Sequence, residues 1–275
     1  MNETIQNPNK SLWEKGDFTR IAATMRESGE KVIESLGVTS KMSVLDLGCG
    51  DGTTAIPAAK RGASVLGVDI ASNLVAAGRR RAEEQDLKNV EFREGDATNL
   101  SDLKDNSFDL LVSMFGAMFA PKPMDVAREM VRVTRPGGRI VMGNWIPNDP
   151  TLVAQILKVS ASYSPPPPDG FISPITWGVE ANALERFANA GVQNDQIYFS
   201  RGTYIFRHQG TPSEFLALFR NYYGPTMNAY AAAAKNDKEQ DLHRELEQLF
   251  NMHNIAECDN ETVIPATYLK VTVTL

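Results

Sequence analysis

The sequence predicts an α/β protein built on a doubly wound, mostly parallel sheet with helices on both faces. Short apolar or β-branched runs alternate with helical stretches through the first half of the chain. Three glycines directly follow the first of these runs, where a strand must turn sharply into a helix. The chain has 275 residues, of which 42% are hydrophobic and 23% charged, so it can bury a large core. Because no long linker or internal repeat interrupts it, we expect a single domain over residues 1–275.

Five strands and three helices are predicted before residue 145. The strands are 43–47, 64–69, 90–94, 108–113 and 139–143, and the helices are 53–61, 73–85 and 124–134. Ser72 is positioned as the N-cap of the second helix, where its oxygen can accept a bond from a free amide. Pro136-Gly-Gly138 should end the third helix, because these residues cannot continue it.

The pattern changes after residue 143. A helix at 151–160 precedes SYSPPPPDGFISPITWG, where four consecutive prolines favour an extended path. Further along the chain we expect a helix at 179–190, a strand at 196–207, helices at 212–222 and 227–250, and a last strand at 263–275. These elements define a core of about 40–145, 178–208 and 263–275, with cap insertions at about 146–177 and 210–255.

The stretch VLDLGCGDGTT places Gly48, Gly50 and Gly52 between a strand and a helix. Such a turn brings backbone N–H groups to a ligand with no Cβ atoms in the way. The dinucleotide fingerprint G-x-G-x-x-G would need a glycine where Thr53 stands, so a nicotinamide cofactor is disfavoured.

Three aspartates accompany this turn. Asp69 ends the second strand, 21 residues after Gly48, where a carboxylate can accept the ribose hydroxyls of any adenosine cofactor. Asp46 precedes the glycines and Asp96 follows the third strand. Extra carboxylates would repel a pyrophosphate but attract a cofactor with a positively charged amino-acid tail.

Five motifs occur in order across about residues 40–145: VLDLGCGDGTT, VLGVDIA, GDAT, FDLLVSMFGAMFAPKP and RPGGRIV. Together they resemble the class I S-adenosylmethionine-dependent methyltransferases, in particular the group related to the ubiquinone/menaquinone C-methyltransferases. The resemblance implies a Rossmann-like, seven-stranded sheet whose last strand lies antiparallel between the fifth and sixth, and S-adenosylmethionine as the cofactor. It also implies the cofactor contacts: Asp46, Gly48 and Gly50 for the methionine part, Asp69 for the ribose, Asp96 and the Ala97 backbone for the adenine edge, Ser113 from below, and Ile70 and Phe115 flanking adenine and sulfonium.

No motif identifies the methyl acceptor, which we expect to be a small, largely apolar molecule. Aromatic residues of the cap are the candidate acceptor contacts, although they could instead pack the cap onto the sheet: Trp145, Phe171, Trp177, Tyr222 and Tyr223. The catalytic residue is unknown, with His208, after a predicted strand, as one candidate. Methyl transfer from a sulfonium mainly needs in-line placement and exclusion of water, so no triad is required.

Two other functions stay open on the sequence alone. Every cofactor residue could be intact in a protein that binds S-adenosylmethionine without transferring its methyl group. A nicotinamide-dependent oxidoreductase is the second alternative, against which the missing third glycine of the fingerprint argues.

Composition excludes several classes of partner. The net charge of -6 and the absence of a basic stripe argue against nucleic acid. Cys49 and Cys258 match no metal-ligand spacing, so we expect reduced thiols and no metal. The longest largely apolar run, 110–121, is shorter than the ~20 residues that span a bilayer, and the opening residues lack a signal-peptide core. We therefore expect a cytoplasmic protein with no membrane association; the oligomeric state is not indicated.

Overall fold

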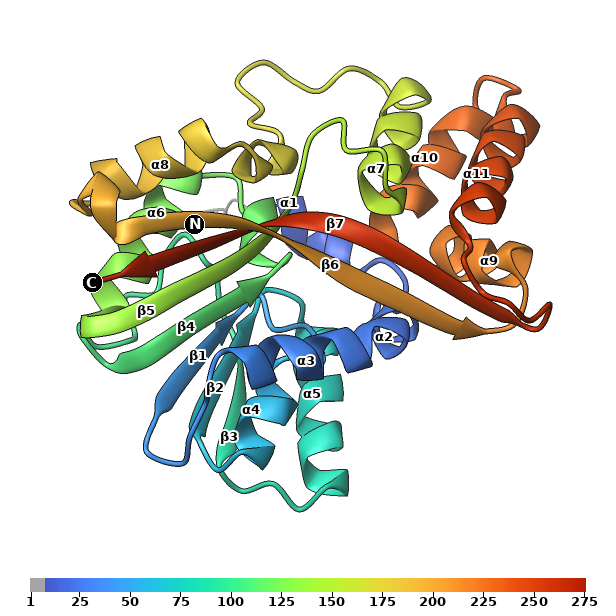
Figure 1. Cartoon of the computed structure of the whole chain (residues 1–275). Coiled ribbons are helices and arrows are strands. Elements are labelled where there is room, and N and C mark those ends of the chain that lie inside the picture. Colours follow the sequence, from blue (N-terminus) through green and yellow to red (C-terminus); the bar gives the residue numbers. More distant parts are fainter. Residues whose placement is uncertain (1–7) are drawn as a thin grey trace, which may run out of the picture.

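A mixed seven-stranded sheet forms the centre of the computed structural model, which describes residues 8–275 (Figure 1). The strands are β1 (Ser43–Leu47), β2 (Ser64–Asp69), β3 (Val90–Glu94), β4 (Phe108–Met114), β5 (Thr134–Trp145), β6 (Ile197–Gln209) and β7 (Glu261–Thr274). Their order is β3-β2-β1-β4-β5-β7-β6, and β7 pairs antiparallel with both β5 and β6 while the first five strands are parallel. The predicted doubly wound sheet with an antiparallel last strand is therefore confirmed.

Helices surround the sheet and form a cap at one end of it. The α-helices are α1 (Pro8–Glu14), α2 (Thr19–Ala22), α3 (Arg26–Ser35), α4 (Ala55–Lys60), α5 (Ser72–Glu84), α6 (Pro123–Val133), α7 (Leu152–Ser162), α8 (Glu180–Asn189), α9 (Pro212–Tyr222), α10 (Gly224–Ala234) and α11 (Glu239–His253). Short 3₁₀ turns lie at η1 (Ala23–Met25), η2 (Ala117–Phe119), η3 (Pro174–Gly178) and η4 (Asn194–Gln196). No helix among these described residues is long and apolar enough to cross a bilayer.

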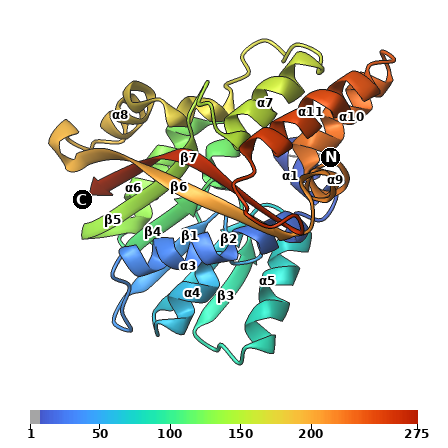
Figure 2. The ribbon, with the colours of Figure 1, turned by 45° about the vertical axis from the view of Figure 1, so that its right-hand side comes forward.

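Helices α3, α4 and α5 cover one face of the sheet, and α6 and α8 cover the other (Figures 1 and 2). The side chains of β4 pack against the helices on both faces of the sheet. Leu110 and Val112 pack in the apolar cluster beneath α3 and α4, whereas Leu111 packs in the cluster that includes α6 and α8. Successive side chains of a strand point to opposite faces, so a strand buried on both faces is apolar throughout.

The cap lies beyond the ends of the parallel strands. Helices α7, α9, α10 and α11 gather there, and the long strands β6 and β7 extend past β5 to meet them (Figure 1). Helix α1 contacts both α10 of the cap and α5 of the core. The N-terminal helices, which the sequence patterns did not predict, thus join the two parts of the molecule.

Three local predictions were wrong. The N-cap of α5 is Ala71 rather than Ser72, whose hydroxyl donates instead to Glu14. The helix expected at 227–250 is interrupted between α10 and α11, where Asp237 takes a left-handed conformation (φ +58°) that an α-helix cannot contain. Pro136-Gly-Gly138 lies inside β5, because α6 already ends at Val133.

Candidate active site

The glycine turn between β1 and α4 combines close packing with open space. Gly48, Gly50 and Gly52 all have positive φ, at +72°, +54° and +86°. A Cβ on Gly48 would lie 2.6 Å from Gly116 Cα, and one on Gly52 would lie 2.7 Å from the Phe92 ring. A Cβ on Gly50 would meet nothing within 4 Å. Packing thus explains two of the glycines, whereas the third borders a space in which a ligand can approach the backbone.

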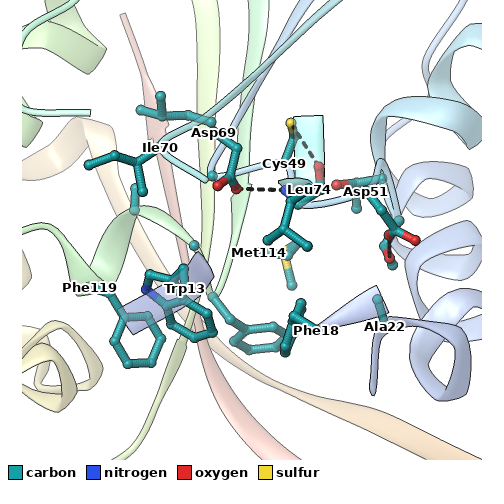
Figure 3. Close-up of a pocket in the computed structure, with 18 of the residues that line it drawn as sticks. Trp13, Phe18, Ala22, Cys49, Asp51, Asp69, Ile70, Leu74, Met114 and Phe119 are labelled. Atoms are coloured by element: carbon teal, nitrogen blue, oxygen red, sulfur yellow. Dashed lines mark hydrogen bonds between the residues drawn. The ribbon is translucent and has the colours of Figure 1, made fainter. Parts of the chain in front are cut away.

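Asp69 lies at the end of β2 beside this space. One carboxylate oxygen accepts the Gly50 N–H at 2.8 Å, and the other accepts the Ala71 N–H at 2.9 Å. The side chain is buried, and this burial raises its pKa. Because a carboxylate offers about four acceptor positions, these backbone bonds leave acceptor capacity for a ligand. Figure 3 shows Asp69 bonded across the turn, next to Ile70.

The loop after β3 completes this end of the pocket. One oxygen of Asp96 accepts both the N–H and the hydroxyl of Thr98 at 2.8 Å, which fixes the loop. A single pocket is lined by most of the residues that the resemblance implied as cofactor contacts: Gly48, Gly50, Asp69, Ile70, Asp96, Ala97 and Phe115.

Asp46 and Ser113 do not line that pocket, because both lie behind the turn. One oxygen of Asp46 accepts the Thr54 hydroxyl at 2.6 Å, and the other has no hydrogen-bond partner among the described residues. Burial raises the pKa of Asp46 to about 7. The Ser113 hydroxyl donates to the Leu47 carbonyl at 2.6 Å and accepts the Ala117 N–H at 3.0 Å. Both side chains therefore hold the glycine turn through hydrogen bonds on the side away from the pocket.

Phe115 connects the turn to an aromatic region. It has a positive φ of +64°, which is rare for a bulky residue and is found mainly where function or tight packing demands it. Its ring stacks on Trp145 with centroids 3.7 Å apart and meets Tyr204 edge-on at 4.9 Å. All three residues line the pocket. The strain at Phe115 thus places an aromatic ring next to the glycine turn.

Aromatic rings from distant parts of the chain form the opposite side of the pocket. The Trp13 ring contacts Phe119 at 4.9 Å, Phe18 at 5.5 Å and Tyr223 at 5.9 Å between centroids. We call these four residues the aromatic wall. In Figure 3, Trp13, Phe18 and Phe119 face Asp69 and Ile70 across the pocket, with Met114 between them.

Sequence reasoning missed the N-terminal half of this wall. Trp13 and Phe18 precede the first predicted strand and belong to no motif of the resemblance. The signal that was available is the apolar spacing of Ile21, Ala22 and Met25, which is typical of one helix face and lines the same pocket.

The structure separates the predicted acceptor contacts into two groups. Trp145 and Tyr223 line the pocket. Phe171 is 54% exposed on the proline-rich segment and does not reach it. Trp177 is buried elsewhere, beneath the Arg186 guanidinium, whose carbon lies 4.4 Å from the indole centroid.

Tyr222 and His208 also lie outside the pocket. Tyr222 directly precedes Tyr223, and it meets the Arg20 guanidinium at 5.9 Å instead. His208 stacks on Phe215 with centroids 5.3 Å apart, and burial lowers its pKa. Neither side chain is positioned to contact a ligand between the glycine turn and the aromatic wall.

Comparison with known proteins identifies the family. Residues 45–142 match the family described as "Methyltransferase domain". An uncharacterized protein of Mycobacterium tuberculosis is 31% identical over 226 residues, which cover 82% of this chain and 80% of that protein. A demethylmenaquinone methyltransferase of Paenarthrobacter aurescens is 37% identical over 114 residues, or 42% of this chain and 43% of that protein. The chain belongs to the class I S-adenosylmethionine-dependent methyltransferases.

The crystal structure of a putative methyltransferase from Bacillus halodurans has the same fold as this methyltransferase. The two chains are 16% identical, and they superpose with a TM-score of 0.58 over 90% of this chain and 98% of the other. At this identity the likeness concerns the fold, and the pocket must be judged on its own residues.

The charges of the pocket fit the family's cofactor, S-adenosylmethionine. Three carboxylates line it, Asp51, Asp69 and Asp96, and no described lining residue is Lys, Arg or His. Asp51 is neutralised by Arg26 at 2.8 Å and Arg81 at 3.3 Å, which leaves the other two to face a ligand. A sulfonium and an ammonium group are favoured by such a lining, whereas a pyrophosphate is not.

The cysteine that lines the pocket is not activated as a nucleophile. The Cys49 thiol is buried in the turn, and burial raises its pKa well above the ordinary value, so it stays protonated. Within residues 8–275, no group of three His, Cys, Asp or Glu side chains could hold a metal ion.

Proposed function

We propose that this methyltransferase transfers the methyl group of S-adenosylmethionine to a small, uncharged and largely apolar acceptor bound against the aromatic wall. One observation carries the proposal: a single pocket is lined at one end by Gly50, Asp69 and Asp96 and at the other by the aromatic wall. A continuous pocket allows two ligands to meet inside the protein.

The glycine-turn end has the groups that S-adenosylmethionine needs. Asp69 would accept the ribose hydroxyls, and Asp96 with the Ala97 backbone would bind the adenine edge. The space beside Gly50 would take the amino-acid part, and Ile70 and Phe115 would flank the adenine and the sulfonium. When bound, the cofactor supplies a methyl group already activated by a positively charged sulfur.

The aromatic end indicates the chemistry of the acceptor. Trp13, Phe18, Phe119 and Tyr223 offer ring faces and edges, and no cationic side chain of the described lining could neutralise an anion there. An acceptor with a carboxylate or phosphate would also be repelled by Asp69 and Asp96. A neutral apolar molecule is thus the class that this lining accepts most favourably.

The chain's own task in the reaction is placement and exclusion of water. The aromatic wall would hold the acceptor, while residues of α1 and of the cap cover it. Burial raises the pKa of both Tyr204 and Tyr223, so both hydroxyls stay protonated at neutral pH and cannot take a proton from the acceptor. Holding two reacting atoms in line removes much of the entropic barrier of a bimolecular reaction. The acceptor should therefore be one that reacts without a strong protein base.

The cap insertions at about 146–177 and 210–255 would belong to the acceptor half of a single domain. They contribute Val153, Phe219 and Tyr223 to the pocket. We expect these segments to become ordered most fully when both ligands are bound, as a cover that keeps water from the transferring methyl group.

A labelling experiment tests the proposal. The protein is incubated with S-adenosylmethionine that carries a deuterated methyl group, together with a metabolite extract fractionated by polarity, and products are detected by mass. We expect a labelled product in the apolar, uncharged fractions, and much less of it with the Asp69→Asn variant at a cofactor concentration below the wild-type Kd. Label only in anionic fractions would contradict the proposed acceptor class, and binding of the cofactor without any labelled product would contradict transfer.

A further inference from the structure

Tyr204 lies between the two ends of the pocket. Its ring meets Phe115, next to the glycine turn, edge-on at 4.9 Å, and it meets Tyr268 at 6.1 Å. It shares a face of β6 with Phe206, since residues two apart in a strand point the same way, and both line the pocket. Asp46, behind the glycine turn, is near enough to act electrostatically on its hydroxyl. Tyr204 thus stands where an acceptor would approach the cofactor.

Among the residues that the structure describes, the Tyr204 hydroxyl has no hydrogen-bond partner. The residue is only 1% exposed, yet its hydroxyl makes no hydrogen bond with any described residue. The hydroxyl is not one of the fully buried polar atoms that lack a partner, so it reaches the space of the pocket, where a polar atom of a ligand can bond it. A phenylalanine would make the same ring contacts with Phe115 and Tyr268. Packing therefore explains the ring of Tyr204 and leaves its hydroxyl without a role.

The surroundings keep this hydroxyl a donor. Burial is the main cause that raises the pKa of Tyr204, and the neighbouring Tyr268 and Asp46 raise it further. The phenol is consequently protonated at neutral pH, and its proton is available to a hydrogen-bond acceptor on a ligand. The Tyr223 hydroxyl also lacks a partner among the described residues, but the Tyr223 ring lies on the aromatic wall beside Trp13 and Phe18 rather than against Phe115.

We infer that Tyr204 orients the methyl acceptor by donating a hydrogen bond to an oxygen of that molecule. This inference rests on the proposed function and narrows it. The substrate class becomes apolar molecules that carry a hydrogen-bond-accepting oxygen, at the edge that faces the cofactor, to orient the atom that takes the methyl group. A hydrogen bond from Tyr204, beside Phe115, would fix the acceptor's orientation. The apolar contacts of the aromatic wall would add affinity but would not select one orientation.

Two probes of equal ring size separate the hydrogen bond from apolar packing. Binding of 1-naphthol and of naphthalene is measured by equilibrium dialysis to protein saturated with S-adenosylhomocysteine. In Tyr204→Phe we expect 1-naphthol to bind about three- to tenfold more weakly, the net effect of one neutral hydrogen bond, and naphthalene to bind within twofold of the wild type. Tyr198→Phe is the matched control, because Tyr198 lies on the same strand but is 59% exposed and outside the pocket.

Each other result decides against the inference. Equal losses for both probes in Tyr204→Phe would mean that the ring packs but the hydroxyl orients nothing. Unchanged binding of 1-naphthol in Tyr204→Phe, with a loss in Tyr223→Phe, would move the role to Tyr223. Binding of neither probe by wild-type protein that still binds S-adenosylhomocysteine would contradict the apolar acceptor itself, and with it the role of Tyr204. Affinity for S-adenosylhomocysteine serves as the measure of correct folding in every variant.

Discussion

Replacing Gly50 by alanine separates a ligand-binding role of the glycine turn from a purely structural one. Gly50 has a φ of +54°, and a Cβ there would meet nothing within 4 Å. Gly37, just after α3, offers a matched control with a φ of +65° and the same open surroundings, but it does not line the pocket. Both alanine variants should lose about 1–2 kcal/mol of stability, the cost of an L-residue in the left-handed region. For a chain of this size, that lowers the melting temperature by a few degrees in each case.

Only the Gly50 variant should lose cofactor affinity. Its new methyl group projects into the space that the cofactor's amino-acid part would occupy, and we expect at least about tenfold weaker binding of S-adenosylhomocysteine, or about 1.4 kcal/mol. Isothermal titration calorimetry measures this loss, and thermal unfolding confirms that the two variants are equally stable. Equal affinities of Gly50→Ala and Gly37→Ala would refute the reasoning, because the turn would then be a packing feature without a ligand.

Three further perturbations test other parts of the site. Asp69→Asn should weaken S-adenosylmethionine binding at least roughly tenfold in calorimetry, because hydrogen bonds to a charged group contribute about 1.5–3 kcal/mol; an unchanged affinity would remove Asp69 from the ribose site. The pKa of Asp46 is raised to about 7 in the folded state, so the unfolded chain releases this proton at a lower pH than the folded chain does. As pH rises, the free energy of unfolding of the wild type therefore falls relative to that of Asp46→Asn. Urea unfolding should show that difference growing by about 2–3 kcal/mol between about pH 5 and 8 and staying constant above, and a pH-independent difference would contradict the burial argument. Glu14 accepts the N–H and hydroxyl of Ser72 at 3.0 and 2.6 Å, so Glu14→Gln should speed hydrogen exchange in α1 about two- to fivefold, as expected for a partly exposed contact; identical exchange would show that this contact does not hold α1.

The sequence was most informative where local pattern and tertiary role coincide. Strands β1, β2 and β3 begin and end at the predicted residues. The first two are short apolar runs, whereas β3 alternates apolar and charged residues, and turn-forming residues adjoin each strand. The glycine turn could also be predicted from the sequence, since its positive φ angles require glycine. Asp69 follows from this pattern as well, because the end of a strand next to such a turn has a fixed place in the fold.

Only some residues of the acceptor end of the pocket could be predicted from the sequence, because this end is formed by segments far apart in the chain. Aromatic composition alone suggested Phe171 and Trp177, but it could not show that one points to solvent and the other packs under Arg186. Trp13 reaches the pocket only through the docking of α1 against α5 and α10, which no local pattern encodes. In the sequence Tyr204 is an ordinary strand residue, and the role inferred for it depends on a hydroxyl that meets no hydrogen-bond partner among the described residues, which only the folded chain reveals.

The most direct test of the account is a crystal structure of the protein with S-adenosylhomocysteine. We predict that the ribose hydroxyls bind Asp69, that the adenine lies beside Asp96 and Ala97, and that the sulfur faces the pocket bounded by the aromatic wall. A nucleoside bound away from the glycine turn would contradict the cofactor site. A sulfur directed away from the aromatic wall would contradict the claim that the two ends of this pocket hold the two partners of a methyl transfer.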